Sequence, residues 1–391
     1  MNSRSENSRP ISRRLVLGLS GLTALSLAAC TPVVKPAASP TTEAPPPTTK
    51  TATTPNVQEA PTSAFLLATL AHSDRIARIN PEKLDPGAVE FLEVGAAPWG
   101  IGVHAESGVA YAATAEGLAV IDLKTFTRTA LVPYQHPATS ITQGEYRPGG
   151  LGLAVAPDGS AVYVATSLDI QNCFLEKFNV ALGKFTGSVP VGWRPFDVVV
   201  SPDGALVTTI DHDSFSVTVV DTATLAATKH EIAPFGTQGG LGSWEKLHYG
   251  AVEASGAVLL PVQGKVVVRF DPRTGKSTKL ESTANSHAHG TTLFDEQLLT
   301  VGTGSFGNAD GEPNLSVLDV ASGTERVAPL DVPHETVAGF SDAASEAWAA
   351  VAGGNTRNEG WEGITFVKLS DLSQRRLAVA GYPQAVVAYR A

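Results

Sequence analysis

Short apolar runs separated by turn residues fill the chain from residue 65 onward. Residues 189–229 read VPVGWRPFDVVVSPDGALVTTIDHDSFSVTVVDTATLAATK, in which β-prone stretches rich in Val and Thr alternate with Pro, Asp, Gly and Ser. This pattern predicts a small antiparallel sheet of four short strands. Because one such sheet of about 40 residues cannot bury both of its faces alone, it requires neighbours of the same kind.

The same order of features recurs along the chain. The copies open at Pro98, Pro148, Pro195, His248, His287 to His289, and Pro333-His334. Their spacing of about 40 to 55 residues is typical of β-propeller blades. The C-terminal GYPQAVVAYRA reads as a single innermost strand, whereas Phe65 to Val94 reads as three strands that lack a first. We therefore predict an all-β, seven-bladed β-propeller over residues 63–391, closed by pairing of the N- and C-terminal strands.

The first 29 residues differ from the rest in composition. They hold four Arg followed by an apolar run, Leu15 to Ala29, which is too short to span a membrane comfortably. This predicts a signal peptide. Leu27-Ala28-Ala29-Cys30 resembles a bacterial lipobox, which implies cleavage before Cys30 and diacylation (palmitate-type lipidation) of its sulfur. Ser12-Arg13-Arg14 also resembles a twin-arginine signal, so both the Sec and the twin-arginine export routes stay open.

Residues 30–62 begin with Cys30 and continue with Pro, Thr and Ala and almost no large apolar residues. Such a segment cannot form a core and predicts an extended tether that reaches up to roughly 100 Å. We expect a lipoprotein held by its N-terminal lipid at the extracytoplasmic face of the cell membrane.

The charge of the chain argues against nucleic acid as a partner. Removal of residues 1–29 takes four Arg and one Glu from 28 basic and 38 acidic residues, which leaves a net charge of −13. An acidic surface repels nucleic acid and is compatible with cations. Cys173 is then the one thiol besides Cys30, so no internal disulfide is expected.

Four long loops are predicted on one face of the propeller. They connect blades or join the second strand of a blade to the third, and they cover Pro133 to Arg147, Pro234 to Leu247, Gly302 to Asn314 and Gly353 to Gly363. Because binding residues concentrate in loops held by a rigid scaffold, this face is the expected binding face.

Histidines stand at nearly the same point of three consecutive copies, where the chain would enter the central channel. They are His248, His287 or His289, and His334. Converging neutral imidazoles suit a zinc-like ion, so we predict a metal site at the channel mouth, with either His287 or His289 pointing inward. The alternative is that each His caps a strand or binds channel water.

Other polar residues are candidates to support this metal site. The carboxylates near the histidines are Glu253, Asp310 and Glu335. Asp211-His212-Asp213 forms a further polar cluster on the same face. Its side chains either stabilise the turn in which they lie or serve as peripheral ligands of the metal.

Several segments carry a family resemblance. VGWRPFDVVVSPDG, VTVVDTAT, APDGSAVYVAT and AVIDLKT resemble the YVTN-repeat family of seven-bladed propellers, and the resemblance extends from Phe65 to Ala391. This family includes binding proteins, lactonase-like enzymes and cell-surface proteins. HYGAVEASGAVLLPV and the histidines resemble propeller metallochaperones, which implies an ABC-transporter solute-binding protein, or another envelope protein, as partner.

The sequence favours binding over catalysis. It contains no G-x-S-x-G, P-loop or H-E-x-x-H motif, and we assign no catalytic residue. The first hypothesis is a cell-surface binding protein or chaperone that holds a zinc-like ion at the channel mouth. The alternatives are a lactonase- or lyase-like enzyme in which a metal polarises a carbonyl, and a protein or glycan interaction platform of the cell envelope.

Overall fold

The computed structural model describes residues 64–232, 246–262, 266–282, 288–304, 311–354 and 361–390. The predicted signal peptide, Cys30 and the tether lie outside the described residues, as do His287 and Asp310. Within the described part, no helix is long and apolar enough to cross a membrane.

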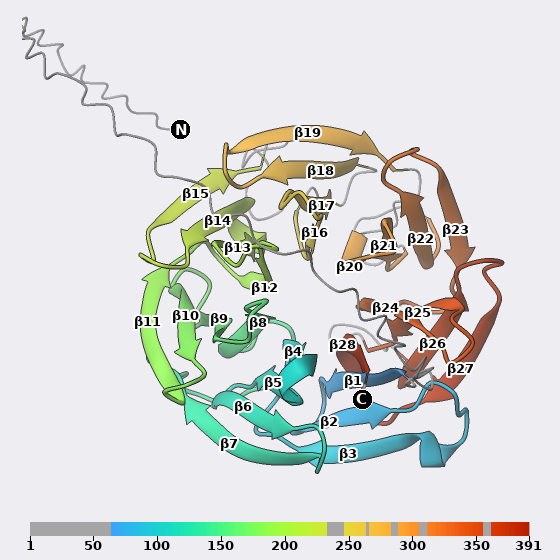
Figure 1. The fold of residues 1–391 in the computed structure, drawn as a ribbon, viewed down its shortest axis with the longest axis horizontal. Coiled ribbons are helices and arrows are strands. Elements are labelled where there is room, and N and C mark those ends of the chain that lie inside the picture. Colours follow the sequence, from blue (N-terminus) through green and yellow to red (C-terminus); the bar gives the residue numbers. More distant parts are fainter. Residues whose placement is uncertain are drawn as a thin grey trace, which may run out of the picture. The chain divides into compact units, whose positions relative to one another are not determined.

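Seven four-stranded antiparallel sheets follow one another around a ring (Figure 1), which confirms the predicted seven-bladed propeller. Blade 1 contains β28 (Pro383–Arg390), β1 (Ala64–Leu70), β2 (Arg75–Ile79) and β3 (Val89–Glu93). Blade 2 contains β4 (Ile101–His104), β5 (Val109–Ala113), β6 (Gly117–Asp122) and β7 (Thr127–Pro133). Blade 3 contains β8 (Gly149–Val155), β9 (Ala161–Ser167), β10 (Cys173–Asn179) and β11 (Lys184–Pro190).

The remaining four blades have the same strand order. Blade 4 contains β12 (Pro195–Val200), β13 (Leu206–Asp211), β14 (Ser216–Asp221) and β15 (Ala227–Glu231). Blade 5 contains β16 (Ala251–Val252), β17 (Val258–Val262), β18 (Val266–Asp271) and β19 (Lys276–Glu281). Blade 6 contains β20 (Ala288–Phe294), β21 (Gln297–Gly302), β22 (Asn314–Asp319) and β23 (Glu325–Pro329). Blade 7 contains β24 (Val337–Ser341), β25 (Ala347–Ala352), β26 (Gly363–Lys368) and β27 (Gln374–Ala378). Three short 3-10 helices are η1 (Pro86–Ala88), η2 (Ala105–Ser107) and η3 (His212–Ser214).

Blade 1 closes the ring by joining the two ends of the folded chain. β28 pairs antiparallel with β1, so that Phe65 lies opposite Tyr389 and Leu66 opposite Ala388. The predicted closure is therefore confirmed. Its physical effect is to remove the open sheet edges that a linear array of blades would leave.

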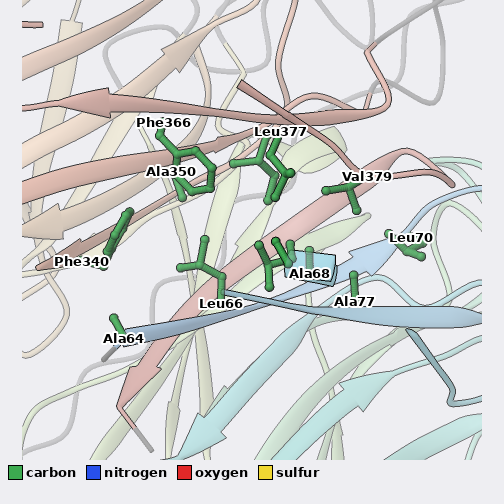
Figure 2. Packing of buried hydrophobic residues seen from close by; sticks show 13 residues of the cluster. Ala64, Leu66, Ala68, Leu70, Ala77, Phe340, Ala350, Phe366, Leu377 and Val379 are labelled. Atoms are coloured by element: carbon green, nitrogen blue, oxygen red, sulfur yellow. The ribbon is translucent and has the colours of Figure 1, made fainter. Parts of the chain in front are cut away.

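The core lies between neighbouring blades. The two middle strands of a blade are buried on both faces, as in β13 and β14, where Val, Ile and Thr alternate within a nearly unbroken buried run. The outer strands β15 and β19 are mostly exposed and rich in Lys, Thr and Glu. Figure 2 shows one such layer, in which Leu66 and Leu70 of blade 1 belong to the same cluster as Phe340 and Phe366 of blade 7.

The innermost strands of the blades run parallel around the channel (Figure 1). Because each blade is an antiparallel meander, the points where the chain enters the innermost strands lie on one face, called here the mouth face. The turns that join the first strand of a blade to its second lie on the other face.

Candidate functional site

Three buried side chains converge on the mouth face. They are Glu145, His248 and His289, and one ligand atom from each lies within 4.8 Å of the others. The Nε2 atom of His248 is 3.3 Å from Oε1 of Glu145. The ring centroids of His248 and His289 are 3.8 Å apart. We call these three residues the mouth triad.

Each member of the mouth triad comes from a different part of the ring. His248 precedes β16 of blade 5, and His289 lies at the start of β20 of blade 6. Glu145 lies in residues 134–148, which connect blade 2 to blade 3 and are called here the mouth loop. The repeat position predicted His248 and either His287 or His289, of which the described residues include His289. The sequence marked the mouth loop as an expansion, but spacing along an irregular loop does not show which of its residues turns inward, so Glu145 was missed.

Glu335 holds His289 in place. Its Oε2 atom is 2.9 Å from Nδ1 of His289, and the Glu335 carbonyl oxygen is 3.1 Å from the same nitrogen. Gln384 Nε2 donates to the same carboxylate at 3.3 Å. These contacts to Nδ1 fix the orientation of the His289 ring.

The protonation of His289 reflects two opposing effects. Burial by itself lowers the pKa of the imidazole, but the charge and hydrogen bond of Glu335, helped by the charge of Glu145, outweigh burial and raise the pKa above its ordinary value. The two carboxylates therefore favour the protonated form of His289 more than water does. A bound cation would replace that proton.

His212 and aromatic side chains surround the triad. The His212 ring centroid is 4.6 Å from that of His248, and burial lowers the pKa of His212 to about 4, so its imidazole is neutral. The Phe196 ring lies 4.8 Å from His248, and the Tyr249 ring stacks on His248 at 5.0 Å. This wall displaces water, which strengthens electrostatic interactions inside it. Phe196 and Tyr249 were not singled out from the sequence, because aromatic residues next to strands usually belong to the core.

The mouth loop is anchored at both ends. The backbone amides of Gln135 and His136 donate to the buried carboxylate of Glu176 at 2.7 and 2.9 Å. Near the other end, Arg194 Nη1 donates to the carbonyl of Tyr146 at 2.7 Å. These bonds hold the backbone on either side of Glu145.

The other predicted site residues have different surroundings. His334 is fully buried, with Nδ1 2.8 Å from the Val332 carbonyl and Nε2 2.8 Å from the Thr365 hydroxyl. Both of its ring nitrogens are thus engaged, and burial lowers its pKa to about 4. The structure does not bring His334 to the triad, because its imidazole is turned into its own blade. Glu253 lies in the turn at the far end of β16, where its carboxylate pairs with Arg269.

The Asp211-His212-Asp213 cluster is divided between different roles. Asp211 accepts hydrogen bonds from the hydroxyls of Thr209 and Thr218, both at 2.6 Å, within blade 4. Asp213 pairs with Lys246 at 2.9 Å. His212 is the one member of this cluster that lies beside the mouth triad.

No protein-family model and no curated protein matches the chain. Several solved structures are similar to the chain. Virginiamycin B lyase from Staphylococcus aureus is similar with 13% identity and a TM-score of 0.54, over 81% of this chain and 89% of the lyase. The β-propeller domain of Cps50 (Swd1) from Myceliophteria thermophila is similar with 14% identity and a TM-score of 0.54, over 74% of this chain and 88% of the domain. Hydrazine synthase from Kuenenia stuttgartiensis is similar with 14% identity and a TM-score of 0.52, over 70% of this chain and 77% of the synthase chain. At these identities the likeness concerns the fold, and it agrees with the seven sheets described above: the chain is a seven-bladed β-propeller.

Proposed function

We propose that this protein is a lipid-anchored binding protein of the cell envelope that holds a zinc-like divalent ion in its mouth triad. One observation carries the proposal: two imidazoles and one carboxylate, all buried, converge to within 4.8 Å from three separate segments of the chain. Two His and one carboxylate are a ligand set typical of zinc with one open coordination position.

The spacing of the triad suits such an ion. In a tetrahedral site with bonds of about 2.0 to 2.1 Å, ligand atoms lie about 3.3 Å from one another. His248 Nε2 and Glu145 Oε1 already have this separation, at 3.3 Å. A ligand atom of His289 lies within 4.8 Å of the other two. Glu335 supplies the outer carboxylate that commonly orients a metal-binding imidazole.

The resemblance to propeller metallochaperones suggests transfer of the ion to a partner, such as the solute-binding protein of an ABC transporter. The membrane anchor at Cys30 and a tether over residues 30–62 would then let the propeller reach that partner from the membrane surface.

Metal analysis tests the binding function. The chain from residue 31 onward is dialysed against trace zinc, and bound metal is measured by mass spectrometry. We expect about one equivalent of zinc, which the His248→Ala/His289→Ala variant loses. His72→Ala is the matched control, because His72 is exposed in a turn of blade 1. A double variant that keeps its zinc would exclude the triad as the site.

The His289–Glu335 pair favours a second candidate function, the cleavage of an ester or lactone. Glu335 orients the His289 ring through Nδ1, and His289 would exchange a proton with the substrate, while an ion on Glu145 and His248 would polarise a carbonyl. Among the similar structures, a histidine-to-alanine variant of virginiamycin B lyase, solved with quinupristin, is described as catalytically inactive. Turnover of lactones that falls in Glu335→Gln at unchanged zinc content would establish this function. Absence of turnover in the zinc-loaded protein would exclude it for the substrates tested.

A further inference from the structure

A second binding compartment lies deeper in the channel. A cavity of about 350 Å³ is lined by residues of the innermost strands, among them Thr291, Val337 and Val386. Each innermost strand has a hydrogen-bonded neighbour on one side within its sheet, so its other edge faces the channel. The wall of this cavity therefore offers backbone donors and acceptors from several blades.

Among the described residues that line this cavity, Asp197 is the only one of the types Asp, Glu, Lys, Arg or His. Its Oδ2 atom accepts from the backbone amide of Gly250 at 3.0 Å, and its Oδ1 atom accepts from Val198 N at 2.9 Å. Within the described part of the chain, no basic side chain forms an ion pair with Asp197. A carboxylate in such a place is costly unless a cation compensates it. In agreement, burial raises the pKa of Asp197 to about 7.

Three aromatic side chains line the same cavity as this carboxylate. They are Trp99, Phe196 and Tyr249. Trp99 and Phe196 stack with ring centroids 6.1 Å apart. Trp99 and Phe196 are almost fully covered by other protein atoms, so Tyr249, at 8% exposure, is the aromatic side chain of this set that reaches the cavity surface. An accessible aromatic face attracts organic cations, most strongly where water is excluded.

The size of the cavity argues against a bare metal ion as its occupant. A volume of about 350 Å³ would hold on the order of ten waters, at about 30 Å³ each. Among the described lining residues a single carboxylate faces this space, so a divalent ion would keep an uncompensated positive charge there. One negative charge beside an aromatic ring fits a bulky monovalent cation.

We propose that the central channel binds a small organic ammonium cation, with the carboxylate of Asp197 as its counter-ion and Tyr249 as its aromatic contact. This proposal does not rest on the metal function, because neither Asp197 nor Tyr249 belongs to the mouth triad.

Calorimetric titration of the chain from residue 31 onward, kept metal-free with EDTA, tests this site separately from the triad. The probes are choline, tetramethylammonium, and 3,3-dimethyl-1-butanol, which has the shape of choline without the charge. We expect choline to bind at least tenfold more tightly than the neutral alcohol. Asp197→Asn should lower choline affinity at least tenfold. The matched control, Asp221→Asn, changes an aspartate of the same blade that caps an outer turn, and it should bind like the wild type.

The comparison of choline with its neutral isostere uses the wild type and holds even if Asp197→Asn does not fold, which circular dichroism would show. Three results would overturn the proposal: neither ammonium probe binds the wild type, the neutral alcohol binds as tightly as choline, or a folded Asp197→Asn variant keeps its affinity for choline.

Discussion

Oε2 of Glu335 lies 2.9 Å from Nδ1 of His289, and both side chains are buried at the entrance to the channel. The two residues come from neighbouring blades, so their pairing links blade 6 to blade 7 at the same point where the mouth triad forms. If the mouth triad binds a metal as proposed, the stability of the metal-free protein and the metal affinity would be coupled through this one imidazole.

The first prediction concerns the pH dependence of stability without metal. Although burial opposes it, Glu335 raises the pKa of His289 above its unfolded value. The ion pair therefore stabilises the fold fully below the unfolded pKa of about 6.5, and this stabilisation is lost as pH rises through the folded pKa. We expect Glu335→Gln to lower the free energy of unfolding by about 3 kcal/mol near pH 6. The difference should shrink at higher pH. Urea unfolding in EDTA from pH 5.5 to 9 measures it, and a difference that does not vary with pH would contradict this account.

The second prediction concerns the carboxylate of the mouth triad. Glu145→Gln should weaken zinc binding at least tenfold, because a neutral amide is a poorer ligand than a carboxylate. Affinity of the wild type should fall as pH decreases from 8 to 6, since zinc competes with protons for both imidazoles. Competition with a zinc chelator of known affinity measures both effects. Glu106→Gln, an exposed change in η2, is the control and should leave affinity unchanged.

The third prediction concerns the anchor of the mouth loop. Glu176 is fully buried, and its carboxylate accepts hydrogen bonds from the backbone amides of Gln135 and His136. Glu176→Gln should remove about 1 to 3 kcal/mol of charged hydrogen bonding from the start of the loop. Hydrogen exchange of residues 134–148 should then accelerate while the strands of blade 3 stay protected, and zinc affinity should fall because Glu145 is held less firmly. Unchanged exchange in the loop would show that other contacts hold it.

The fourth prediction separates the structural role of Asp211 from metal binding. Asp211→Ala leaves the buried hydroxyls of Thr209 and Thr218 without their acceptor, so we expect a loss of about 3 kcal/mol in unfolding free energy. Zinc stoichiometry should stay at the wild-type value. A folded variant that loses zinc would instead make Asp211 part of the site.

The fifth prediction concerns the contribution of Asp211 to the pH dependence of the unfolding free energy. Burial raises its pKa to about 7 from an ordinary value near 3.8. The folded state therefore holds the proton more tightly, and the contribution of this group is complete below about pH 3.9 and is lost as pH rises through 7. Comparison of the wild type with Asp211→Asn between pH 4 and 8 isolates this contribution, and parallel stability profiles would argue against it.

The sequence alone determined the architecture. Strand formation is local, so it can be predicted from Val- and Thr-rich runs, the turn residues between them and their regular spacing. Because such sheets need neighbours, seven blades and the pairing of β28 with β1 were also predictable. The repeat position also predicted His248 and one of His287 and His289 at the channel entrance, because the blade geometry is the same in each copy.

Which polar residues meet depends on the folded arrangement of the blades and loops. His334 occupies nearly the same repeat position as His248, yet its ring turns toward Thr365, and a side-chain rotamer of this kind depends on packing rather than on repeat position. Glu145 enters the triad from an irregular loop, whose path is set by distant partners such as Glu176 and Arg194. In the sequence, Asp197 is one polar residue in an apolar strand. It lines a cavity shared by several blades only because the seven innermost strands surround one central channel.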